Sequence, residues 1–194
     1  NSNMAFGIFL MKNPPFDTLK DFVPLHALAQ NGFVLTVGTE SPAKSARDLA
    51  ALLKSRGERN RYGTTSPAAV LATEAYRQLG QFQAVRVDYK NAPEAVPDLN
   101  NGTLDFIIMD GISAVGIVKS GRLRGLAVTT AQRIESLPEV PTMQEAGFAG
   151  FESAPWWAAY APAGTPAPVV DKLTGLFRAV ISAPETREEL RKFA

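Results

Sequence analysis

Polar residues suited to binding a ligand gather at three points where a predicted strand gives way to a predicted helix. They are Thr64, Thr65 and Ser66; Tyr89, Lys90 and Asn91; and Asp110 with Ser113. The first amides of a helix have no partner within the helix and carry partial positive charge, so such a junction can bind an anion. Helix capping is the commoner role of any one junction. Three junctions on one sheet edge favour a site that binds a small anion.

Asp110 is the unusual member of this group, because a carboxylate repels an anion. One interpretation makes it a cap for the helix that follows. The other makes it a hydrogen-bond acceptor for a hydroxyl, an amine or a bound water of the ligand. The sequence leaves both open.

Catalytic residues are not evident in the sequence. The glycine-rich nucleotide-binding motifs and the G-x-S-x-G nucleophile motif are missing. With no cysteine and His26 as the only histidine, the sequence argues against zinc binding and His-based triads. We expect His26 to be structural. The sequence therefore predicts a binding protein without a metal or a cofactor. An α/β enzyme acting on a carboxylate remains the alternative, weakened by the missing nucleophile and base.

The charge and hydropathy of the chain exclude two classes of partner. Twenty basic and nineteen acidic residues give a formal net charge of +1, which argues against nucleic acid or a membrane surface as a partner. No run approaches the ~18 apolar residues of a membrane span, so we expect a protein that is not embedded in a membrane. The first sixteen residues lack the features of a signal peptide. If the protein is exported, we expect this chain to be the mature form or a piece of it.

The stretch from Leu104 to Thr130 indicates which strands and helices position these junctions. Residues 104–109 and 123–128 have the apolar pattern of strands buried on both faces, and residues 112–119 between them are predicted to form a helix. Two such strands should be parallel, with a right-handed crossover. Asp110 and Ser113 then lie at the carboxyl end of a central strand, where open α/β sheets bind ligands.

The preceding part of the chain repeats the alternation of strand and helix. The expected order is a strand at 33–37, a helix at 45–55 capped by Ser45 and Asp48, a strand at 61–63, a helix at 68–79 between Pro67 and Gly80, a strand at 84–89 and a helix at 93–100 with Pro97 near its first turn. This order predicts one parallel-rich sheet with helices on both faces.

The regular alternation ends after Thr130. We expect a strand within residues 22–29, a short helix at 142–146, an extended aromatic run at 151–162, a helix at 168–181 and a last helix capped by Ser182 with Glu185. Trp156 and Trp157 are interpreted as packing residues or, alternatively, as a stacking platform.

Several phrases, taken in order, resemble one known family. They are Phe16-Asp17 with Lys20-Asp21-Phe22, Pro42-Ala43-Lys44-Ser45, Tyr62-Gly63-Thr64-Thr65, Tyr89-Lys90, Gly121-Arg122-Leu123-Arg124, Leu126-Ala127-Val128-Thr129, Leu137-Pro138-Glu139-Val140-Pro141-Thr142, Glu145-Ala146-Gly147 and Ala161-Pro162-Ala163-Gly164-Thr165-Pro166. The family is Bug, also called TctC, the extracytoplasmic substrate-binding proteins of tripartite tricarboxylate transporters. The resemblance covers essentially all 194 residues.

The resemblance implies a two-lobed periplasmic binding protein of type II that closes on a small organic carboxylate in the cleft between its lobes. Residues 32–153 would form a complete lobe 2, and residues 1–31 and 154–194 part of lobe 1, truncated at both ends relative to the family. Ser2 and Asn3 occupy the position of a family loop that touches ligand. Ser66-Pro67-Ala68 replaces a glycine-rich family loop, which changes the number of amides facing the ligand.

The resemblance also implies partners and a compartment. The protein would work in the periplasm and deliver its ligand to membrane transporter subunits, or alternatively report it to a signalling system. One apolar face of the 168–181 helix must be buried somewhere, and its residues are Val169, Leu173, Leu176, Phe177 and Val180. We expect that face to be covered by further chain or by a second copy in a dimer.

Overall fold

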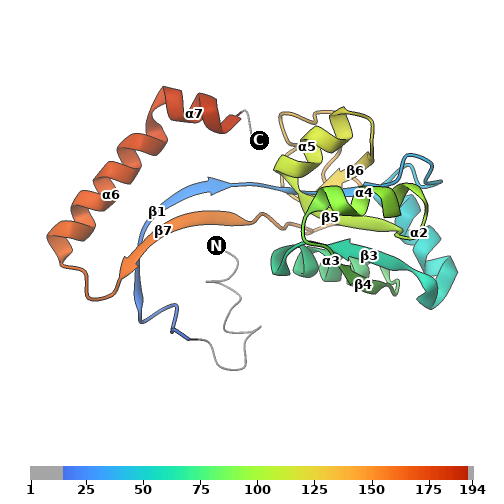
Figure 1. The fold of residues 1–194 in the computed structure, drawn as a ribbon, viewed down its shortest axis with the longest axis horizontal. Coiled ribbons are helices and arrows are strands. Elements are labelled where there is room, and N and C mark those ends of the chain that lie inside the picture. Colours follow the sequence, from blue (N-terminus) through green and yellow to red (C-terminus); the bar gives the residue numbers. More distant parts are fainter. Residues whose placement is uncertain (1–14, 192–194) are drawn as a thin grey trace. The chain divides into compact units, whose positions relative to one another are not determined.

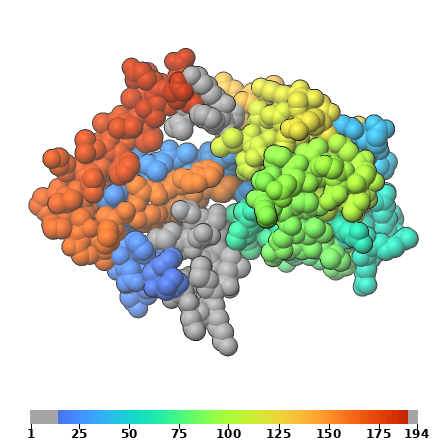
Figure 2. All heavy atoms as spheres, in the orientation of Figure 1, coloured from blue at the N-terminus to red at the C-terminus, as the bar shows by residue number. Residues whose placement is uncertain are grey.

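The computed structural model describes residues 15–191, with side chains to residue 189. The chain divides into two compact units (Figure 1). The larger unit is one continuous stretch, Asn31–Ala154. Its atoms, cyan through yellow in Figure 2, form a continuous packed body. The smaller unit combines the chain before and after that stretch.

The larger unit is built on a five-stranded sheet with the order β4-β3-β5-β2-β6. The strands are β2 (Phe33–Val37), β3 (Arg61–Thr64), β4 (Val85–Asp88), β5 (Phe106–Asp110) and β6 (Arg124–Val128). Strand β3 pairs in parallel with both β4 and β5, whereas β2 pairs antiparallel with both β5 and β6. The predicted parallel direction of β5 and β6 is therefore confirmed. Unexpectedly, the antiparallel strand β2 lies between them.

Helices cover both faces of this sheet, as the sequence predicts. They are α2 (Ala46–Arg56), followed by the short 3-10 helix η1 (Gly57–Arg59), then α3 (Pro67–Gly80), α4 (Ala92–Asn100) and α5 (Gly111–Lys119). Successive strand residues point to opposite faces. Phe106 and Ile108 accordingly join one buried cluster with residues of α2 and α3, while Ile107 and Met109 join a second with residues of α4 and α5.

Each of these four α-helices begins at a side chain that caps its first turn. The accepting atoms are Ser45 Oγ (from Asp48 N, 3.1 Å), Ser66 Oγ (from Ala69 N, 3.2 Å), Asn91 Oδ1 (from Glu94 N, 3.2 Å) and Asp110 Oδ1 (from Ser113 N, 2.9 Å). Such a cap stabilises a helix by about 1 kcal/mol. These capping residues explain why the starts of the helices can be predicted from the sequence.

Two details of these helices correct the sequence interpretation. The left-handed residue after α3 is Gln81, with φ of 54°, and Gly80 is the last helical residue. Gly80 is instead required for packing, because an added Cβ would lie 2.8 Å from the ring of Phe82. Pro97 lies inside α4 rather than near its first turn, so this short helix lacks one backbone donor in its second half.

Residues 142–146, which were expected to form a helix, form a turn instead. Pro141 O accepts from Val128 N and Met143 N donates to Val128 O, both at 2.8 Å, so the chain here pairs with the edge of β6. Thr142 and Glu145 then bond reciprocally, each side chain accepting from the other's amide. Because Gly147 follows with φ of 92°, the chain completes only one turn.

Within the described residues, the smaller unit contains two antiparallel strands and two helices. They are β1 (Phe22–Gln30), β7 (Trp156–Pro162), α6 (Ala167–Ser182) and α7 (Pro184–Arg191). Helix α6 packs against β1 but has no fully buried residue. Val169, Leu176 and Val180 are 46%, 54% and 55% exposed, so much of its apolar face is uncovered within the described residues. Trp156 and Trp157 are also partly exposed, at 39% and 41%.

One expected cap in this unit is wrong. Ser182 is the last residue of α6, and the boundary residue between the two helices is Ala183. Helix α7 begins at Pro184, a residue preorganised for the first helical position. His26 lies partly buried on β1 opposite Ala159.

Candidate functional site

The parallel strands β4, β3 and β5 end at the same edge of the larger unit's sheet, and the three polar junctions lie there. Thr64 is in register with Asp88, and Thr64 O accepts a hydrogen bond from Tyr89 N at 2.9 Å. Asp110 ends β5, the neighbour of β3 on its other side. We call this the carboxyl edge.

The junction between β3 and α3 presents few free side-chain groups. Thr64 is 1% exposed, and its hydroxyl donates to Ser66 O at 3.1 Å. Ser66 Oγ is used as the helix cap. Thr65 is partly exposed, and its side chain makes no hydrogen bond within the described part of the chain. Ala69 N and Val70 N are bonded to Ser66, so Thr65 and the Ala68 amide are the groups left for a ligand. Because Pro67 has no N–H, Ala68 supplies the first amide inside the helix.

Tyr89 is oriented by a hydrogen bond to the next helix. Its hydroxyl donates to Asp98 Oδ2 of α4 at 2.7 Å, and its ring packs against the cluster that α4 and α5 share. Burial, reinforced by the Asp98 carboxylate, raises the pKa of Tyr89 to about 12. The phenol is therefore neutral at physiological pH, and its proton is committed to Asp98. It borders the carboxyl edge as a fixed neutral group.

Asp110 caps α5 through its bond from the Ser113 amide, so the capping interpretation describes the structure. Both residues are partly exposed at the carboxyl edge. Ser2 and Asn3, the other two predicted ligand residues, lie outside the described residues.

Two residues at this edge were missed because the sequence predicted a parallel-rich sheet and gave no direction for the strand at 33–37. Since β2 is antiparallel, its first residue Phe33 pairs with Asp110, and Asn31 and Gly32 therefore lie at the carboxyl edge. Gly32 O accepts from Gly111 N at 2.8 Å. The signal that would have placed Asn31 correctly is the direction of β2, which depends on pairing between distant segments.

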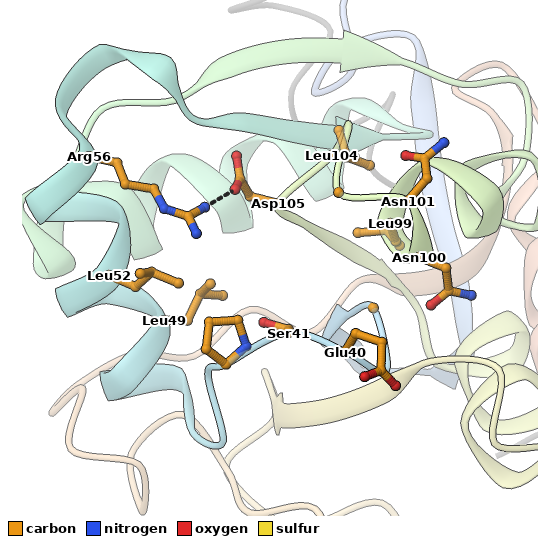
Figure 3. A pocket seen from close by; sticks show the side chains of 13 residues that line it. Glu40, Ser41, Leu49, Leu52, Arg56, Leu99, Asn100, Asn101, Leu104 and Asp105 are labelled. Atoms are coloured by element: carbon orange, nitrogen blue, oxygen red, sulfur yellow. Dashed lines mark hydrogen bonds and ion pairs between the residues drawn. The ribbon is translucent and has the colours of Figure 1, made fainter.

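A cavity of about 300 Å³ lies at the opposite edge, where β5 begins (Figure 3). It is lined by Gly38, Glu40, Ser41, Pro42, Leu49, Leu52, Arg56, Leu99, Asn100, Asn101, Gly102, Leu104 and Asp105. Arg56 pairs with Asp105 at 2.8 Å, as the dashed line shows. With that cation neutralised and Glu40 adding a carboxylate, the cavity suits an anion poorly. None of the predicted ligand residues lines it.

Two further classes of site are absent from the described residues. Within residues 15–191, no three His, Asp or Glu side chains are arranged to hold a metal ion. None of the helices formed by these residues has the length and hydrophobicity needed to span a lipid bilayer.

Known proteins share both the sequence and the fold of this chain. A Pseudomonas sp. protein from the tcbD-tcbE intergenic region is 33% identical over 99% of this chain. BugT of Bordetella pertussis is 32% identical over 84% of it. The chain spans 58% and 50% of the lengths of these two relatives.

Solved structures resemble the chain closely. The R. palustris protein Rpa4515 with adipate is 29% identical, has a TM-score of 0.83, and matches over 94% of this chain and 62% of its own. The periplasmic binding protein BugD is 25% identical, has a TM-score of 0.85, and matches over 99% of this chain and 65% of its own. These likenesses confirm the α/β periplasmic-binding-protein fold.

The family model named "Tripartite tricarboxylate transporter family receptor" (TctC) matches residues 2–194. This is a family of receptors and not of enzymes. The chain belongs to the TctC family.

Proposed function

We propose that this chain binds a small organic carboxylate at its carboxyl edge as part of an extracytoplasmic receptor that supplies a membrane transporter. Membership of a receptor family supports the general role. The relative solved with adipate supports a carboxylate as the ligand. The family's role supports two further parts of the proposal, a periplasmic location and delivery to the membrane subunits of a tripartite transporter.

The observation that carries the proposal is the start of α3. Ser66 caps this fourteen-residue helix, and Thr65 offers an uncommitted hydroxyl immediately before it. An anion there would accept a hydrogen bond from the Thr65 hydroxyl and from the unpaired Ala68 amide, and the partial positive charge of the helix would favour it.

A calorimetric titration tests the proposal directly. We expect the purified protein to bind adipate and to show no binding of adipamide, which has the same carbon chain but no charge. Equal binding of both compounds would contradict a site built for an anion. Failure of a panel of mono- and dicarboxylates to bind or to raise the melting temperature would overturn the proposed ligand class.

The proposed residues are tested by one substitution and a matched control. Thr65→Val removes the free hydroxyl and should weaken adipate binding. Thr103→Val makes the same chemical change at an exposed position beside the opposite edge and should leave binding unchanged. An equal effect of both substitutions would show that the carboxyl edge is not the binding surface.

A further inference from the structure

Asn31 carries a buried hydrogen-bond donor that has no partner. Its Nδ2 atom is one of three buried, unpaired side-chain atoms within the described residues. The other two belong to Asn60 and Arg77, whose remaining polar atoms are bonded: Asn60 Nδ2 contacts three carbonyl oxygens, and Arg77 binds Glu74 and Gln83. Asn31, by contrast, makes no side-chain hydrogen bond within the described residues.

The surroundings of Asn31 hold its carboxamide at the start of α5. An added Cβ at Gly111 would lie 2.6 Å from Asn31 Oδ1 and 2.9 Å from Gly32 O. The amide oxygen therefore packs against the backbone of the first residue of α5, one residue after Asp110. This close approach is available only to a glycine. It fixes the oxygen and leaves the nitrogen as the uncommitted end of the side chain.

A buried donor without a partner costs free energy in the folded protein, so its presence calls for an explanation. An apolar residue of similar size would avoid that cost if Asn31 served only to fill space. Asn31 as a whole remains partly exposed. Asn31 lies at the carboxyl edge, where an unpaired donor of this kind can be satisfied by a bound molecule.

We propose that Asn31 is a ligand-binding residue whose Nδ2 donates a hydrogen bond to a carboxylate oxygen at the α5 end of the carboxyl edge. This inference rests on the proposed function. Strand β5 separates β3 from β2, and neighbouring strands are about 4.8 Å apart, so the two donor groups are roughly 10 Å apart. A ligand that places one carboxylate at the start of α3 and a second at Asn31 would be a short dicarboxylate.

The test compares Asn31→Leu with the unmodified protein, using adipate and hexanoate as probes. The two acids have the same number of carbons, but hexanoate has a single carboxylate. We expect adipate binding to weaken by about tenfold or more, hexanoate binding to change by less than about threefold, and the ligand-free melting temperature to stay the same or rise. The melting temperature should not fall because no hydrogen bond is lost.

A second variant and a control keep the test decisive. Asn31→Asp preserves shape while replacing the donor with an anion, and it should weaken adipate binding more than Asn31→Leu. Asn101→Leu, at the opposite edge, removes a side chain that accepts from Thr103 N and should leave binding unchanged.

The outcomes separate the inference from the proposed function. If the unmodified protein binds adipate and both Asn31 variants bind it equally well, the inference fails while the proposed function stands. A fall in ligand-free melting temperature with equal losses for adipate and hexanoate would assign Asn31 a structural role and also overturn it. If the unmodified protein binds neither acid, the proposed function itself fails.

Discussion

The hydroxyl of Tyr89 donates a hydrogen bond to Asp98 Oδ2 at 2.7 Å and so joins the end of β4 to the helix that follows. Both residues are partly buried. The bond accounts for part of the rise in the pKa of Tyr89 to about 12, after burial. This raised pKa links the carboxyl edge to the stability of the fold.

Tyr89→Phe should lower the free energy of unfolding by roughly 1 kcal/mol at neutral pH, because Asp98 loses a partner. The effect should depend on pH. The pKa is raised in the folded state, so the contribution is fully present below the unfolded value near 10 and is lost as pH rises through about 12. Urea unfolding at pH 7 and at pH 11 measures both.

The control for Tyr89 is a double-mutant cycle with Asp98→Asn. If Tyr89→Phe and Asp98→Asn destabilise independently, with additive effects, the two side chains are not coupled. That result would remove the hydrogen bond as the explanation.

Arg124 gives a prediction at the opposite edge. Its guanidinium donates to Thr39 O at 2.6 Å, Ser41 O at 2.9 Å and Ala43 O at 3.3 Å, and so holds the loop after β2. Arg124→Lys keeps the charge but loses the planar fork, so we expect a loss of about 1–3 kcal/mol in stability. Adipate affinity should not change. A loss of adipate affinity without a loss of stability would show that this loop affects ligand binding.

The sequence predicts those parts of the fold that depend on local chemistry. Ser45 three residues before Asp48, and Ser66 before Pro67, place two helix starts correctly because capping involves only neighbouring residues. Thr142 and Glu145 form the same local pattern, yet no helix follows, because pairing of this segment with β6 limits it to a turn. Local signals therefore fail where contacts with distant strands decide the conformation.

The same distinction between local signals and contacts with distant strands applies to the candidate site. Thr65 and Tyr89 directly follow strands and Asp110 ends one, and the parallel direction of those strands is enough to bring the three to one edge. Asn31 lies before a strand, and only the antiparallel pairing of β2 with β5 and β6 brings it to that edge. Apolar pattern alone does not reveal the direction of a strand that is buried on both faces.

The two neighbouring threonines at the start of α3 should respond differently to the same substitution. Thr65→Val should weaken adipate binding roughly tenfold, equivalent to about 1.4 kcal/mol, with little change in melting temperature. Thr64→Val removes the buried bond to Ser66 O, so it should lower stability by roughly 1 kcal/mol. Titration calorimetry and thermal unfolding of both variants distinguish these roles. A reversed pattern would mean that Thr64, not Thr65, faces the ligand.

Gly38 provides the sharpest prediction about packing. It lies directly after β2, where an added Cβ would be 2.2 Å from Leu99 O and 2.8 Å from Leu99 C. Both atoms belong to the backbone of α4, so no side-chain rotation relieves the clash. Gly38→Ala should therefore cost at least the roughly 1–3 kcal/mol of an overpacked core.

Gly116 is the matched control for Gly38, because an added Cβ there meets no atom within 4 Å. It lies within α5, where alanine is the better helix former, so Gly116→Ala should raise stability by roughly 0.5–1 kcal/mol. Urea unfolding of the two variants should thus give changes of opposite sign. If Gly38→Ala is as stable as the unmodified protein, β2 and the end of α4 do not approach each other as described. That result would also argue against the antiparallel insertion of β2, which brings Asn31 to the carboxyl edge.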